Sequence, residues 1–211
     1  MKRLLLVFLK YPRPGRVKTR LAEAIGTEEA AIAYRMMVAR TLELCGDSFP
    51  EVIAIAFDPL EEESEIQVWL EPLLSAFPGE INWIPQVTGD LGRRMEVAVE
   101  TTCKAHPDAV VAVVGTDMVH LDRFLVEEAW NVVEEDSNKV VFGPSEDGGY
   151  YLLALQKFES CLFREIPWST STTLEASLAA AEARGLATHL LEKRFDVDSI
   201  EEWKQVEPEL R

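Results

Sequence analysis

Residues 3–20 read RLLLVFLKYPRPGRVKTR, an apolar run that ends at once in a basic loop with two prolines. The uninterrupted apolar segment Leu4–Leu9 predicts a central parallel strand that is covered on both faces. Ala109–Val114 is a second run of this kind. Along the rest of the chain, short apolar segments alternate with amphipathic helical ones. This alternation predicts an α/β protein with a mostly parallel sheet.

The expected elements form a three-layer α/β/α sandwich. We expect strands at Arg3–Leu9, Val52–Phe57, Ile81–Val87, Ala109–Val114, Val140–Gly143, Tyr150–Leu155 and Thr188–Leu191. We expect helices at Glu28–Leu44, Glu62–Phe77, Arg93–Lys104, Arg123–Glu135, Leu174–Arg184 and Ile200–Val206, with Asp122 capping the fourth. Residues 140–155 break the alternation, because an irregular loop or hairpin turn joins two strand-like runs there. No linker divides the chain, so residues 1–211 are expected to form a single domain.

The composition is that of a globular protein, with 47% hydrophobic and 27% charged residues. The net charge of −16 argues against a nucleic-acid-binding protein, which needs a broad basic surface. Every apolar run falls far short of the roughly 20 residues that span a membrane. Cys45, Cys103 and Cys161 are odd in number and widely spaced, so we expect reduced thiols in a cytoplasmic protein.

The basic residues are unevenly distributed along the chain. Residues 1–20 contain seven of the 21 basic residues and no acidic one. The remainder therefore carries 21 − 7 = 14 basic residues against 37 acidic ones. A concentrated positive segment on an acidic body favours a local anion site.

Four polar loops follow expected strands, namely residues 10–20, 115–117, 143–149 and 196–198. Ligands of open α/β sheets bind at the carboxyl ends of the strands. We therefore expect these loops to converge on one crevice.

The first of these loops is suited to a di- or triphosphate. Two prolines and a glycine stiffen it, and five cations lie within eleven residues of a turn that precedes a helix. It lacks the spacing of a phosphate-binding Walker loop. A solvated basic turn is the simpler alternative. The residues expected to hold phosphate are Lys10, Pro14, Gly15, Arg16, Lys18 and Arg20.

The other three loops present carboxylates. Asp117 emerges from the most apolar strand, where a hard cation and a phosphate can meet, or it caps the turn that follows. Asp147 precedes Gly148 and Gly149, which let a backbone approach a ligand closely, although Asp-Gly is also common in plain tight turns. The segment 196–198 places two carboxylates on one side of an extended chain, where Asp198 completes a metal site or only caps the last helix.

Residues 89–95, GDLGRRM, are a further candidate for an anion site. Arg94 lies in the first turn of an expected helix, a position that suits an anion. A plain helix start explains the same residues equally well.

Taken together, the motifs resemble the nucleotide-diphospho-sugar transferase-like proteins, the glycosyltransferases associated with radical-SAM, arsenosugar or selenium gene clusters. These proteins share a GT-A-like superfamily with the molybdenum-cofactor guanylyltransferases. The resemblance spans most of the chain, and its first and fourth segments are the specific ones. The matching segments are residues 8–21 (FLKYPRPGRVKTRL), 89–95, 115–117 (GTD), 143–152 (GPSEDGGYYL), 166–170 (IPWST) and 196–198 (DVD).

The resemblance implies a Rossmann-like GT-A fold, a divalent cation (Mg²⁺ or Mn²⁺) and a nucleotide-diphosphate donor. It implies that Lys18 and Arg20 hold phosphates and that Asp117 binds the metal. We expect Asp198 as the second metal ligand, and Lys18, Asp117 and Asp147 as the catalytic residues. The chain departs from the family at residues 118–119, Met-Val, where the family has Cys-Pro or Ser-Pro.

Three functions remain compatible with the sequence. The first is glycosyl transfer from a nucleotide sugar to a small-molecule acceptor. The second is nucleotidyl transfer from an NTP to a phosphorylated acceptor, with release of pyrophosphate. The third is a non-catalytic nucleotide-binding domain, motivated by the departure at residues 118–119. The base, the sugar, the acceptor and the oligomeric state are left open by the sequence.

Overall fold

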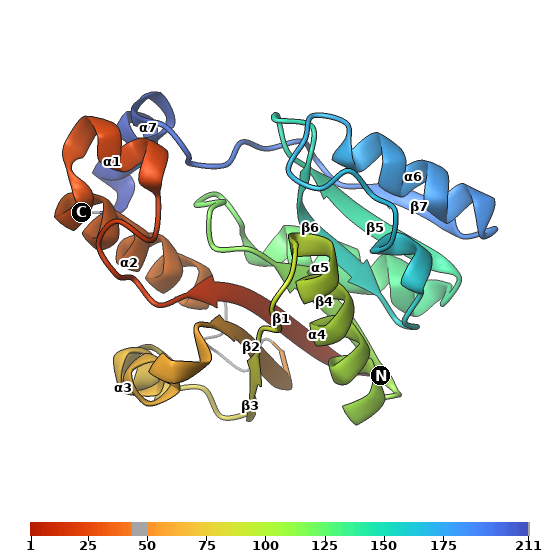
Figure 1. Cartoon of the computed structure of the whole chain (residues 1–211). Helices are drawn as coiled ribbons and strands as arrows, with labels where there is room; N and C mark the ends of the chain where they lie inside the picture. Colours follow the sequence, from red (N-terminus) through yellow and green to blue (C-terminus); the bar gives the residue numbers. More distant parts are fainter. Residues whose placement is uncertain (44–49, 211) are drawn as a thin grey trace.

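The computed structural model describes residues 1–43 and 50–210, and seven strands form one sheet within it (Figure 1). The strand order is β3-β2-β1-β4-β6-β5-β7. Strands β1 to β4 are mutually parallel, β6 is antiparallel to both neighbours, and β7 is parallel to β5. The mostly parallel α/β fold is therefore confirmed. The strands are β1 (Lys2–Lys10), β2 (Val52–Asp58), β3 (Glu80–Pro85), β4 (Ala109–Val114), β5 (Lys139–Pro144), β6 (Tyr150–Leu155) and β7 (Ala187–Leu190).

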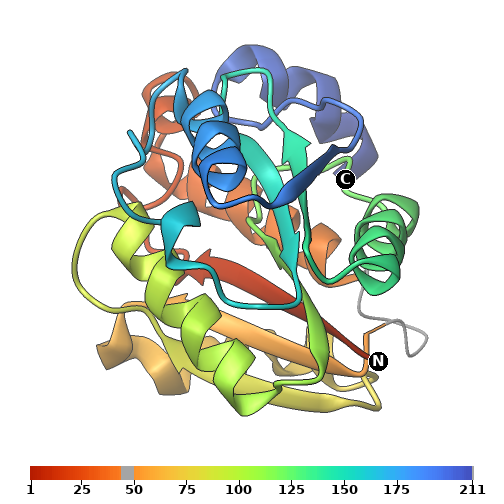
Figure 2. The same cartoon turned by 90° about the vertical axis from the view of Figure 1, so that its right-hand side faces the viewer.

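Helices cover both faces of the sheet (Figure 2). One face packs against α2, α3 and α5, and the other packs against α4 and α6. A third apolar cluster joins α1, α2 and α7 beyond the sheet. The helices are α1 (Thr19–Ile25), α2 (Thr27–Glu43), η1 (Leu60–Glu62), α3 (Glu63–Leu74), α4 (Leu91–Ala105), α5 (Arg123–Glu135), η2 (Ser160–Leu162), α6 (Thr173–Ala183) and α7 (Ile200–Leu210). None of these helices is long and apolar enough to cross a membrane.

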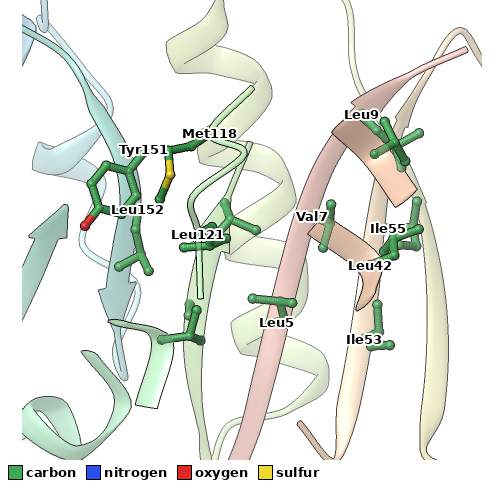
Figure 3. Close-up of a cluster of buried hydrophobic side chains, with 14 of the residues drawn as sticks. Leu5, Val7, Leu9, Leu42, Ile53, Ile55, Met118, Leu121, Tyr151 and Leu152 are labelled. Atoms are coloured by element: carbon green, nitrogen blue, oxygen red, sulfur yellow. The ribbon is translucent and has the colours of Figure 1, made fainter. Parts of the chain in front are cut away.

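Strand β1 is covered on both faces, as its uninterrupted apolar sequence predicts. Leu5, Val7 and Leu9 belong to the core beneath α2, α3 and α5 (Figure 3). Leu4 and Leu6 belong to the core on the opposite face. Burying one such side chain fully stabilises the fold by about 1.5–3 kcal/mol. A strand at the centre of the sheet can therefore hold its two ends, and the loop that follows, in fixed positions.

Several elements differ from the expected bounds by a few residues; α3 ends at Leu74 and not at Phe77, and α7 continues to Leu210 and not to Val206. Two further differences lie at the carboxyl ends of strands. A short helix, α1, begins at Thr19 inside the predicted basic loop, so this loop ends at Lys18. Strand β3 ends at Pro85 and not at Val87. Gln86 N–H still donates a hydrogen bond to Phe57 O of β2, and the backbone leaves the sheet beyond this residue. The predicted helix end at Leu44, and Cys45, lie outside the described residues.

A segment that we call the crossing segment, residues 191–199, joins β7 to α7 across the carboxyl ends of the strands (Figure 1). Its backbone bonds to β5, to the loop after β5 and to the turn after β4. Leu191 N–H donates to Phe142 O at 2.9 Å, and Arg194 N–H donates to Pro144 O at 3.0 Å. Val197 N–H donates to Asp117 O at 2.9 Å. The crossing segment therefore ties the C-terminal part of the chain to the loops after β4 and β5.

Candidate functional site

The loop after β1 is fixed at two buried residues and exposed between them. Pro12 and Val17 are buried, whereas residues 13–16 lie at the surface. Arg16 N–H donates to Arg13 O at 2.9 Å, and the Arg13 side chain forms an ion pair with Glu62. The loop is thus an ordered turn that presents its tip to solvent.

Lys18 ends this loop in an unusual conformation. Its φ and ψ are both 47°, the left-handed region that costs a non-glycine residue roughly 1–2 kcal/mol. Its side chain is nevertheless only 4% exposed. Strained residues of this kind are concentrated at functional sites, because the surrounding structure must hold them.

The Lys18 ammonium binds three acceptors from two distant parts of the chain. Nζ lies 2.7 Å from Asp117 Oδ1, 2.7 Å from Val197 O and 3.2 Å from Asp198 Oδ1. An ammonium has three N–H donors, so all of them are used. Burial disfavours the charged lysine, but the carboxylates of Asp117 and Asp198 outweigh it, and the pKa of Lys18 is raised. Lys18 is therefore a charged residue at neutral pH.

Asp117 and Asp198 remain accessible to solvent although both contact Lys18. Their side chains are 46% and 51% exposed. Arg20 Nη1 lies 3.7 Å from Asp198 Oδ2, although the Arg20 side chain is 80% exposed. The structure thus brings Lys18, Arg20, Asp117 and Asp198 together at one end of the sheet.

Asp196, the other carboxylate of the segment 196–198, lies close enough to this cluster to interact with its charges. Burial raises its pKa to about 7, and the carboxylates of Asp117 and Asp147 add to the shift, while Lys18 opposes it. Asp196 and Asp198 flank Val197, which is buried. This is the alternation that the sequence predicts for the extended segment 196–198.

Asp147 lies in a tight turn between β5 and β6. Its Oδ1 accepts a hydrogen bond from Gly149 N–H at 2.8 Å, and Ser145 N–H donates to Gly149 O at 3.0 Å. Gly148 has a φ of 90°, and an added Cβ would overlap the backbone of Ser171. Gly148 therefore lets this turn pack closely against the backbone of Ser171, just before α6.

The turn that presents Asp117 is held without the proline that the resemblance leads us to expect at residue 119. Met118 and Val119 are both buried, in two different apolar clusters. Leu121 N–H donates to Met118 O at 3.2 Å, and Val197 N–H holds the carbonyl of Asp117. Packing and the crossing segment therefore fix the position of this carboxylate.

Tyr34 lies next to the cluster through Thr116, and no pattern in the sequence indicates its role. Its hydroxyl oxygen accepts hydrogen bonds from Lys10 N–H at 2.9 Å and from Thr116 Oγ1 at 3.2 Å. Burial, followed by the negative charge of Asp117, raises the pKa of Tyr34. A neutral, buried phenol from α2 thus connects the end of β1 to the turn that carries Asp117.

Arg94 lies at the same edge of the sheet but outside the Lys18 cluster. Its Nη1 is 3.3 Å from Asp58 Oδ2, and its Nε donates to Gly89 O at 3.1 Å. Asp58 ends β2 beside Lys10 on β1. Arg94 therefore faces the loop after β2, and its guanidinium already has a carboxylate partner.

Two further motifs of the sequence pack against each other. An added Cβ on Gly92 would overlap the indole of Trp168, whose Nε1–H donates to Phe163 O at 3.1 Å. Asp90 caps α4 by accepting a hydrogen bond from Arg93 N–H at 2.8 Å. Segments 89–95 and 166–170 thus have a structural reason for their residues.

The cluster suits a divalent cation that also binds a ligand's phosphates. Among residues 1–43 and 50–210, no three Asp, Glu, His or Cys side chains come close enough together to hold a metal by themselves. Mg²⁺ is commonly bound by only one or two carboxylates, with phosphate oxygens and water as its other ligands. Asp117 and Asp198 are two such carboxylates, and both remain about half exposed. The donor set therefore fits Mg²⁺ or Mn²⁺ together with a phosphate.

Solved structures define the class to which this fold belongs. A protein from Desulfovibrio desulfuricans G20, provisionally described as a nucleotide-diphospho-sugar transferase, is 28% identical with a TM-score of 0.81, over 94% of this chain and 84% of that one. CMP:2-keto-3-deoxy-manno-octonic acid synthetase in complex with CTP is 12% identical with a TM-score of 0.57, over 100% and 98%. Rv0371c of Mycobacterium tuberculosis H37Rv in complex with manganese is 10% identical with a TM-score of 0.57, over 98% of each chain. The chain therefore has the GT-A-like fold of nucleotidyltransferases.

The family follows from the sequence. The chain belongs to the family described as "Uncharacterized protein conserved in bacteria (DUF2064)", whose profile matches residues 41–170. No curated protein matches it in sequence.

Proposed function

We propose that this protein is a divalent-metal-dependent glycosyltransferase that uses a nucleotide-diphosphate sugar and a small-molecule acceptor. The observation that carries the proposal is the cluster of Lys18, Asp117 and Asp198 at the carboxyl ends of β1 and β4. The likeness to the protein from Desulfovibrio desulfuricans G20, described as a sugar transferase, supports the same choice.

In this proposal the acceptor hydroxyl attacks the anomeric carbon and loses its proton to water, while the bond from that carbon to the diphosphate oxygen breaks. The departing nucleoside diphosphate gains negative charge as this bond breaks. A bound Mg²⁺ or Mn²⁺, held by Asp117 and Asp198, would supply charge neutralisation there.

The residues of the chain would contribute the rest of the phosphate binding. Lys10, at the end of β1, and Arg16, in the loop that follows, have no carboxylate partner within the described residues, and both are exposed. They are therefore available to a phosphate, whereas the Arg13 side chain is paired with Glu62. Cations aimed at a leaving diphosphate lower the barrier because they stabilise charge that develops in the transition state.

Nucleotidyl transfer is the alternative, favoured by fold neighbours such as the synthetase bound to CTP. Here an acceptor phosphate would attack the α-phosphorus of an NTP, and pyrophosphate would leave. The same cations and carboxylates would serve, because both leaving groups are diphosphates.

The experiment incubates the protein with Mn²⁺ and either nucleotide sugars or NTPs, with pooled sugar and sugar-phosphate acceptors. Free nucleoside diphosphate indicates glycosyl transfer, and pyrophosphate indicates nucleotidyl transfer. Asp117→Asn should lower kcat roughly a hundredfold or more. Asp108→Asn is the matched control, because Asp108 is an exposed aspartate just before the other end of β4. Nucleotide binding without turnover of any substrate would favour a non-catalytic domain instead.

A further inference from the structure

The Lys18 ammonium occupies the two carboxylates that the proposed function assigns to the metal. It lies 2.7 Å from Asp117 Oδ1 and 3.2 Å from Asp198 Oδ1. A dication bound to these oxygens would stand within a few ångströms of the ammonium, and the two like charges would repel each other strongly. Lys18 in this position and a metal on both carboxylates therefore exclude each other.

The same contacts also prevent Lys18 from binding a phosphate. Its third N–H donates to Val197 O at 2.7 Å, so the ammonium has no donor left over. The two roles expected from the sequence, phosphate binding by Lys18 and metal binding by Asp117 and Asp198, thus require the same rearrangement of one side chain.

The backbone around Lys18 allows this rearrangement without movement of the fold. Val17 and Leu21, on either side, are both buried in apolar clusters. The lysine side chain itself is a flexible four-carbon stem with a compact charge. Its ammonium can therefore move from the carboxylates to a nearby diphosphate while the main chain stays in place.

We infer that Lys18 is an internal counter-ion that exchanges with the metal when a diphosphate binds. The diphosphate accepts the ammonium, and the released carboxylates accept the divalent cation. The metal alone must displace an ammonium that has no alternative partner, so it binds weakly. With the diphosphate it binds more tightly, and the coupling is reciprocal. This inference rests on the metal and diphosphate site of the proposed function.

The test is binding of Mn²⁺ alone, without nucleotide, measured by electron paramagnetic resonance of free Mn²⁺ and by calorimetry. Lys18→Met removes the competing charge, so Mn²⁺ should bind at least tenfold more tightly, about 1.4 kcal/mol. A residue that merely assisted metal binding would give the opposite sign on removal. Unchanged or weaker binding of Mn²⁺ by the Lys18→Met protein overturns the inference.

Three further variants make the result specific. Arg20→Met removes a nearby positive charge that does not bridge the two carboxylates. Because Arg20 and Asp198 form an exposed pair, this variant should change the affinity for Mn²⁺ by less than about threefold. Asp117→Asn combined with Lys18→Met should abolish the gain, and a retained gain would place the metal elsewhere and overturn the inference. Lys18→Gln keeps a donor for Val197 O, and it must show the same gain if the Met variant fails to fold.

Binding of a diphosphate, measured separately, distinguishes this inference from the proposed function. Inorganic pyrophosphate should bind more weakly to Lys18→Met than to the unmodified protein, because its ammonium partner is missing. A tenfold gain in Mn²⁺ affinity without turnover of any nucleotide substrate would retain the exchange and reject the enzyme. Turnover without that gain would retain the enzyme and reject the exchange.

Discussion

Replacing Tyr34 with phenylalanine tests whether one buried hydroxyl joins the two central loops of the site. The change keeps the ring in the core and removes only the oxygen. That oxygen accepts from Lys10 N–H at 2.9 Å and from Thr116 Oγ1 at 3.2 Å. The threonine hydroxyl can rotate toward another acceptor, whereas the backbone N–H of Lys10 cannot.

A partly buried donor that loses its acceptor costs about 1–3 kcal/mol. For a chain of 150–250 residues this lowers Tm by roughly 2–4 °C per kcal/mol, so we expect a loss of about 2–12 °C. The assay is thermal unfolding followed by circular dichroism, together with amide hydrogen exchange, in which Lys10 N–H should exchange faster.

The matched control for Tyr34→Phe is Thr116→Val, which removes the weaker of the two bonds and should cost less. The double variant measures their coupling. A Tyr34→Phe protein whose Tm lies within about 1 °C of the unmodified one, with unchanged exchange at Lys10, would refute this reasoning.

Two further predictions concern packing and pH. Gly92→Ala should destabilise the fold by about 1–3 kcal/mol, because its new methyl group would overlap Trp168. Gly115→Ala is the control: a Cβ there meets nothing within 4 Å, so the free energy of unfolding should change little. Chemical denaturation of both variants decides this, and equal effects would contradict it. The pKa of Asp196 is about 7 in the folded protein and 3.8 ordinarily, so between about pH 4 and pH 7 the folded state binds more protons than the unfolded state. The unmodified protein therefore loses stability as pH rises through this range. Asp196→Asn removes the group, so it should stabilise the protein by an amount that grows from about pH 4 to about pH 7. Denaturation in EDTA at several pH values measures the difference, which should be constant above pH 7; a pH-independent difference would contradict it.

Much of the fold could be predicted because its elements are encoded locally. Ala109–Val114 and Tyr150–Leu155 are bounded by turn residues, and both strands have the predicted limits. Asp122 accepts a hydrogen bond from Leu125 N–H at 3.0 Å and caps α5 as predicted. Apolar runs and caps act within a few residues of the chain, so the sequence alone reports them.

Helix α1 was missed because its stability is not local. It has seven residues, too few for an isolated helix in water. Its buried residue, Leu21, packs in the cluster that contains Val197 and Trp203, which come from the far end of the chain. The basic, proline-containing stretch before it therefore looked like a continuous loop.

The candidate site could be predicted as a set of loops but not as a set of contacts. The carboxyl ends of parallel strands meet at one edge, which is enough to expect Lys18 near Asp117. That Lys18 binds two carboxylates and a carbonyl depends on the path of the crossing segment, which no local pattern reports. The hydrogen bonds of Tyr34 could not be predicted either, since an aromatic residue inside a helix indicates only that its side chain lies in the core.

The crossing segment explains why the beginning and the end of the chain meet in one cluster. Val197 N–H donates to Asp117 O, and Val197 O accepts from Lys18 Nζ, 179 positions away. With the backbone held on both sides and the Val197 side chain buried, the adjoining side chains of Asp196 and Asp198 must lie on the opposite side of the segment. One residue more or fewer before Val197 would direct a carboxylate into the apolar cluster, where an unpaired charge is very costly. The register of this segment, and not the identity of its aspartates alone, therefore creates the acidic side of the site.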